Sequence, residues 1–134
     1  MNKLQLIFNS LCSTVGIIFG FLFGQVSGVF LVLIAFMSID YVTGVIIAIL
    51  HKELSSNKGF KGIAKKLFIL AFCAIGHMID VYIFADVAVA ENAVIFFYLA
   101  NEGISIIENA TILGLPVPKK IIDVLAQLKN KSNE

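Results

Sequence analysis

The chain has 134 residues, of which 59% are hydrophobic and 14% are charged, and its formal net charge is +1. Soluble domains carry about 25% charged residues, so this composition, with a mean hydropathy of +0.96, excludes an ordinary soluble domain. We expect a single all-α integral membrane domain over residues 1–134, built as a small bundle of four transmembrane helices with two amphipathic cytoplasmic segments. We expect no nucleic-acid partner.

The first predicted span covers about residues 4–24 and contains no charged residue. A helix crosses the hydrocarbon in about 20 residues, so this segment is long enough. Within it, Gly16, Gly20 and Gly24 recur at four-residue intervals, which places them on one helical face where another helix can approach closely. The only basic residue before it is Lys3, and no small-x-small cleavage site follows, so we expect a retained span rather than a signal peptide.

A tight turn over residues 25–28 leads to the second predicted span, residues 29–50, which contains a carboxylate near its middle. An unpaired charge there costs at least about 2.5–3.5 kcal/mol, so Asp40 must be protonated, paired or hydrated. Gly44 and Ala48 follow at intervals of four and share its helical face. This small-residue face favours a helix contact, with Gly44 at the packing surface, or a water-lined seam.

A basic loop, residues 51–66, precedes the third predicted span, residues 67–84. The apolar residues of the loop follow helical spacing, which predicts an amphipathic segment at the membrane surface. Its surface lysines are Lys58, Lys61, Lys65 and Lys66. The third span itself carries two polar groups on one face, His77 and Asp80, three residues apart.

The fourth predicted span, residues 91–113, carries a polar stripe and ends before Gly114 and Pro116. The stripe follows helical spacing and contains Asn101, Glu102, Ser105, Glu108 and Asn109. Counted from the cytoplasmic ends of the spans, Asp40, His77 and Glu102 lie at the same depth, about 15 Å into the membrane. We therefore predict that a protonated His77 lies between the two carboxylates.

The tail, residues 117–134, is the second amphipathic segment. Pro118 can open a helix, with apolar residues on one face and basic residues on the other. We expect Lys119 and Lys120 to lie at the anionic surface of the cytoplasmic leaflet.

The distribution of the lysines, which account for all ten basic residues, indicates the orientation of the chain in the membrane. If both termini and the loop at residues 51–66 are cytoplasmic, every lysine lies on the cytoplasmic side, as the positive-inside rule requires. Four spans with cytoplasmic termini follow. A three-span alternative places the first segment in the interface or the N-terminus outside, because polar residues weaken that segment: Asn9, Ser10, Ser13 and Thr14.

The polar residues do not form a recognisable catalytic constellation. His77 and Asp80 lack a third metal ligand of suitable spacing, and no serine or cysteine nucleophile has a nearby base. Cys12 and Cys73 lie in apolar segments, where a thiol packs as a small hydrophobe. We therefore expect no enzyme, cofactor or metal. Intramembrane carboxylates can act as relays in an ion-coupled transporter, line or seal the interface of a lesion-forming oligomer, or simply hold four helices together.

Two ordered blocks of residues carry a family resemblance. The first is Asp40-Tyr41-Val42-Thr43-Gly44, then Ala48, Leu54-Ser55-Ser56, Gly59, Gly62 and Lys66. The second is Glu102-Gly103-Ile104-Ser105-Ile106-Ile107-Glu108-Asn109, then Gly114, Pro116, Pro118, Ile122 and Leu125. Together they cover about residues 38–128, and their order, length and hydropathy resemble the phage lysis and toxin-secretion holin family. The glycines of the first span lie outside this resemblance.

The resemblance implies a small, non-enzymatic, multi-pass protein of a phage or prophage in the cytoplasmic membrane of the host bacterium. Such a protein forms homo-oligomers in the lipid bilayer and opens lesions. Through them an endolysin, which makes no stable contact with it, or a toxin leaves the cell, and the host lyses. A small ion-coupled transporter is one alternative, although such proteins usually need a carboxylate in the first span. A non-enzymatic accessory subunit of a larger membrane complex is another.

Overall fold

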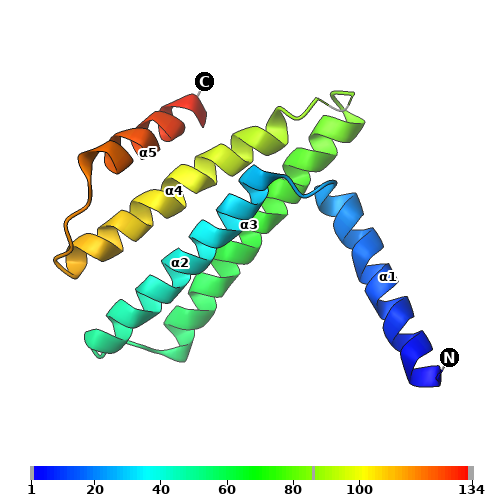
Figure 1. Cartoon of the computed structure of the whole chain (residues 1–134), viewed down its shortest axis with the longest axis horizontal. Helices are drawn as coiled ribbons and strands as arrows, with labels where there is room; N and C mark the ends of the chain where they lie inside the picture. The colour runs from blue at the N-terminus through cyan, green and yellow to red at the C-terminus, as the bar shows by residue number, and fades with distance from the viewer. Residues whose placement is uncertain (1, 86, 133–134) are drawn as a thin grey trace.

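The computed structural model describes residues 2–85 and 87–132, and all the secondary structure within them is helical (Figure 1). This confirms the predicted all-α fold. In chain order, the helices are α1 (Lys3–Phe23), α2 (Gly28–Leu50), α3 (Ser56–Tyr82), α4 (Ala90–Ile112) and α5 (Lys119–Ser132).

In the described part of the chain, three helices are long and apolar enough to cross a membrane, namely α1, α2 and α3. The fourth predicted span corresponds to α4, which is not among them; its polar stripe and its glutamates lower its hydropathy. The third predicted span and the end of the basic loop before it form one continuous helix, because α3 starts at Ser56 rather than at residue 67. Ser55 caps α3 by accepting a hydrogen bond from the Lys58 amide. At 27 residues, α3 is about 40 Å long and exceeds the hydrocarbon thickness of about 30 Å.

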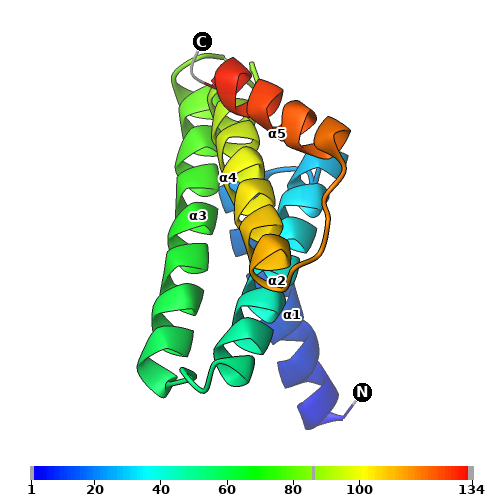
Figure 2. The ribbon, with the colours of Figure 1, turned by 90° about the vertical axis from the view of Figure 1, so that its left-hand side faces the viewer.

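The hydrophobic core lies between α2, α3 and α4, and α4 contacts both other helices (Figure 2). The largest fully buried side chains come one from each helix: Leu33 from α2, Cys73 from α3 and Ile95 from α4. Burial of a large aliphatic side chain stabilises the fold by about 1.5–3 kcal/mol. A small residue lets α3 and α4 meet, since a Cβ on Gly76 would lie 2.9 Å from the Cα of Glu91.

Helix α1 extends away from this bundle and has no buried residue (Figure 1). It contacts α3, and the rings of Phe21 and Tyr82 lie 6.1 Å apart. The connection from α1 to α2 is stabilised by Phe23 against Phe30, with ring centroids 5.3 Å apart.

Of the three glycines predicted to share one packing face, Gly16 and Gly20 lie in α1, whereas Gly24 follows its last residue. Gly24 has a φ of 63°, and a Cβ there would lie 2.4 Å from Cε1 of His77, so this corner requires glycine. Gly16 and Gly20 have no atom within 4 Å of an added Cβ. Their bare face therefore has no intramolecular neighbour.

Helix α5 folds back along α4, beside the bundle (Figures 1 and 2). Its Leu125 is buried and fits against Gly103, where an added Cβ would lie 2.6 Å from Cδ2 of the leucine. The tail predicted to lie at the membrane surface thus has one apolar face on α4, while Lys119 and Lys120 are exposed.

We predict that Gly103→Ala releases α5 from α4. The new methyl group overlaps Leu125, and overpacking of this kind costs about 1–3 kcal/mol. Amide hydrogen exchange across residues 119–131 should become about tenfold faster. Gly44→Ala is the matched control, since its Cβ has open space; equal acceleration by both variants would contradict a specific contact at Gly103.

Candidate polar site in the helix bundle

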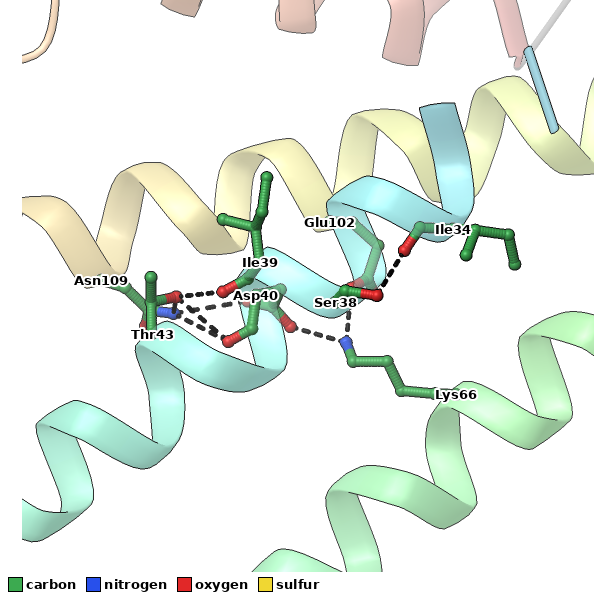
Figure 3. A network of polar contacts seen from close by, with 8 residues as sticks. All are labelled: Ile34, Ser38, Ile39, Asp40, Thr43, Lys66, Glu102 and Asn109. Carbon is green, nitrogen blue, oxygen red and sulfur yellow. Dashed lines mark hydrogen bonds and ion pairs between the residues drawn. The ribbon is translucent and has the colours of Figure 1, made fainter. Parts of the chain in front are cut away.

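A shared lysine joins α2, α3 and α4 (Figure 3). The Lys66 Nζ donates to Oδ2 of Asp40 at 2.7 Å and to Oε2 of Glu102 at 2.5 Å. The lysine side chain is only 17% exposed. Its aliphatic stem lies along the bundle while its ammonium reaches both carboxylates, as long basic side chains commonly do.

An amide extends this network along α4. Asn109 Nδ2 donates to Oγ1 of Thr43 at 2.9 Å and lies 3.4 Å from Oδ1 of Asp40. The threonine hydroxyl in turn donates to the Ile39 carbonyl at 2.8 Å (Figure 3). Asp40 is therefore held by both α3 and α4.

The charges in this network depend on one another. One ammonium faces two carboxylates in a medium where charges attract more strongly than in water. Removing one partner of a buried ion pair typically costs 3–5 kcal/mol, because an uncompensated charge remains. Lys66 thus allows α2 and α4 to bring their carboxylates together.

An aromatic contact closes the α2–α3 hairpin nearby. The Tyr41 hydroxyl lies 3.5 Å from the carbonyl oxygen of Gly59, and a Cβ on Gly62 would lie 3.2 Å from the tyrosine ring. The two glycines therefore leave room for the ring. This gives a physical reason for three residues of the first sequence block.

The prediction that His77 lies between Asp40 and Glu102 is wrong. His77 Nδ1 instead lies 3.1 Å from Oε2 of Glu91, where α3 meets the start of α4. The prediction failed because it began the third span at residue 67, and so grouped Lys66 with the surface lysines. With α3 starting at Ser56, Lys66 lies inside the bundle and takes the place expected for histidine.

Asp80 also has a role that the sequence did not reveal. Asp80 is only 2% exposed. Its carboxylate accepts hydrogen bonds from the backbone amides of Ala90 and Glu91, both at 2.8 Å. These amides belong to the first turn of α4, which lacks intrahelical partners. Asp80 therefore positions the start of α4.

The other predicted residues lie apart from these contacts. Ser105 lines a cavity beside the network, and Glu108 is exposed. Gly44 lines the same cavity and contacts no helix through its bare face, so the expected packing role is not fulfilled within the monomer. Lys58, Lys61 and Lys65 are exposed at the cavity. In the described chain, no group of three His, Cys, Asp or Glu residues is placed to hold a metal ion.

The apolar helices and their charged network define a small α-helical membrane protein. Residues 17–130 match the family described as the bacteriophage holin family. The chain belongs to this family. The match starts at the second half of α1 and includes the whole polar network.

Relatives occur in several bacteria and in a phage. An uncharacterised protein of Listeria monocytogenes is 46% identical over 119 residues, covering 89% of this chain and 84% of the relative. A 14.9 kDa protein of Clostridium perfringens is 39% identical over 118 residues, covering 88% and 89%. A protein of Bacillus phage phi105 named "Probable holin" is 33% identical over 114 residues, covering 85% and 83%. No solved structure gives a significant match.

We predict that Lys66→Met destabilises the bundle by about 3 kcal/mol, because two carboxylates lose their shared counter-charge. Denaturant unfolding of the purified protein in detergent measures this. Lys65→Met is the control, because Lys65 is exposed and such substitutions change stability by about 0.5 kcal/mol or less. Adding Asp40→Asn and Glu102→Gln to Lys66→Met should restore much of the loss. Equal effects of the two lysine substitutions would contradict the shared ion pair.

Proposed function

We propose that this protein is a working holin, which accumulates in the cytoplasmic membrane of a bacterial host and oligomerises there. Its oligomers open lesions that release an endolysin, or a toxin, and so cause lysis. Membership of the holin family and the similarity to the phage phi105 protein support this function. In this proposal both termini are cytoplasmic.

The observation that carries the proposal is the exposure of α1 beside the bundle. This helix is apolar and long enough to cross the membrane, yet none of its residues is buried within the monomer. Gly16 and Gly20 present a bare face with no neighbour. In a bilayer, helices associate through close packing at small residues, so the free face suits α1 of a second copy.

The bundle of α2, α3 and α4 supplies the polar part of the mechanism. Its charges are paired internally, so a monomer can remain in the membrane without lining a pore. As copies accumulate, contacts between α1 helices bring bundles together, and assembly rises steeply with concentration. Separation of α2 from α4 in the oligomer would then expose Asp40, Glu102 and Asn109 to a water-filled lesion.

We predict that Gly20→Leu blocks lysis or delays it severalfold, because the larger side chain prevents close approach. Insertion should be unchanged, since Gly20 has no intramolecular neighbour. The measurement is culture density and membrane potential after induction with a co-expressed endolysin. Thr14→Leu adds bulk on a different face of α1 and is the control.

The same experiment separates the alternative functions. A holin collapses the membrane potential abruptly and releases the endolysin. A transporter would shift uptake or resistance without release, and an accessory subunit expressed alone would do neither. Unchanged timing with Gly20→Leu would remove the bare glycine face from the mechanism.

The native cysteines provide a direct test of α1 pairing. Cys12 is exposed and lies four residues before Gly16, on the same helical face, whereas Cys73 is buried. Because copies of one orientation place their α1 helices parallel, we predict that mild oxidation links Cys12 to Cys12 of another copy. Non-reducing gels should show the dimer, Cys12→Ser should abolish it, and Cys73→Ser should leave it unchanged. A dimer that persists at the same level in Gly20→Leu would contradict pairing through this face.

A further inference from the structure

A cavity of about 790 Å³ lies between α2, α3 and α4. The network around Lys66 forms part of its wall, and the first turns of α3 bring three more lysines to it: Lys58, Lys61 and Lys65. It lies toward the loop end of the α2–α3 hairpin, where Ala48 and Leu54 also line it. The lysine distribution places this end at the cytoplasmic leaflet.

The charges that line the cavity do not cancel. Four lysines line it, whereas among the described residues only two carboxylates do so, Asp40 and Glu102, and both are bonded to Lys66. Lys58 is partly neutralised by Glu53, 3.5 Å away. Lys61 and Lys65 are exposed, which leaves two ammonium groups for an anion at the mouth.

Along α2 and α3 the cavity wall is largely apolar and has room for a chain, whereas α4 lines it with Asn101, Ser105 and Asn109. Gly44 and Ala48 contribute little side-chain volume, and a Cβ on Gly44 would meet nothing within 4 Å. Phe68 and Ile69 continue the apolar lining. A positive mouth joined to an apolar wall on α2 and α3 fits a molecule with an anionic head and a hydrocarbon tail.

We propose that this cavity binds an anionic phospholipid of the cytoplasmic leaflet. Its phosphate lies between the ammonium groups of Lys61 and Lys65, and one acyl chain runs past Gly44 and Ala48. The bound lipid bridges α2 and α3 on the side of the bundle where the charged network opens to the cavity. A free phosphate would bind only at the mouth, because it has no hydrocarbon chain to contact the apolar wall. This inference goes beyond lysis, because it concerns the monomer.

Photo-crosslinking of the full-length protein in vesicles tests this site. Vesicles of phosphatidylcholine receive a small fraction of phosphatidylglycerol carrying a photoreactive acyl chain, and labelled peptides are mapped. We expect labelling of α2 and α3 around Gly44 and Phe68. Since a lysine beside an anionic surface contributes a factor of about five in affinity, Lys61→Gln with Lys65→Gln should reduce labelling about tenfold or more.

Two further variants separate a built site from general attraction. Lys119→Gln with Lys120→Gln removes the same charge from α5, outside the cavity, and should leave labelling within about twofold of the original protein, since screening confines surface charge effects to about a Debye length. Gly44→Phe places a ring in the proposed path of the acyl chain without changing the charge and should reduce the labelling severalfold. Circular dichroism confirms that each variant is folded.

Several results would overturn the proposal. These are equal labelling by photoreactive phosphatidylcholine, equal loss in the α5 variant, or full labelling in Gly44→Phe. Competition by soluble glycerophosphate at the concentration of the lipid would show a free-anion site instead. Crosslinks in the cavity to a second copy in place of lipid would show that another protein molecule occupies it. Lysis is not measured, so failure here is distinct from failure of the holin function.

Discussion

The ammonium of Lys66, shared by Asp40 and Glu102, is the interaction on which the bundle depends. An unpaired carboxylate in the middle of a membrane helix is costly; α2 carries Asp40, and α4 brings a second carboxylate, Glu102, to the same lysine. A single donor from α3 compensates both carboxylates, so the three helices satisfy their charges only when they are together. The apolar contacts of Leu33, Cys73 and Ile95 add packing, but packing alone would leave the carboxylates without a counter-charge.

The chain therefore has two parts. The bundle pairs the charges of its shared lysine network and encloses the apolar core, whereas no residue of α1 is buried. Helix α1 instead presents a surface with no intramolecular partner. Without a hydrophobic driving force between helices in lipid, contact between copies must come from surfaces that allow close approach. Gly16 and Gly20 provide such a surface, and the proposed assembly can therefore proceed without first breaking the bundle.

Much of the fold could be predicted, because hydrophobic blocks and turn residues determine where helices and turns lie through residues that are close in the sequence. The bounds of α2 follow from the turn before it and from the polar residues that follow Leu50. Gly24, which was expected on a packing face, instead lies at the corner between α1 and α2. The partners of the polar residues could not be predicted in this way. Lys66 was grouped with its surface neighbours because helix periodicity does not reveal where a helix starts relative to the bundle, and Asp80 resembled an intramembrane charge although its hydrogen bonds cap α4. These assignments depend on contacts between segments distant in sequence.

The packing of Leu125 on Gly103 has a consequence for membrane topology. Gly103 lies near the middle of α4, so α5 brings its charged face, with Lys120 and Asp123, alongside that level. Lysine and aspartate there would be as costly as any unpaired charge at the bilayer centre. Therefore either α5 is docked on α4, or the side of α4 that contains Gly103 passes through the hydrocarbon, but not both. If the lysines of α5 are to stay cytoplasmic with those of the α2–α3 loop, α4 must cross the membrane and the contact of Leu125 with Gly103 must open. This contact therefore distinguishes two topologies of the chain.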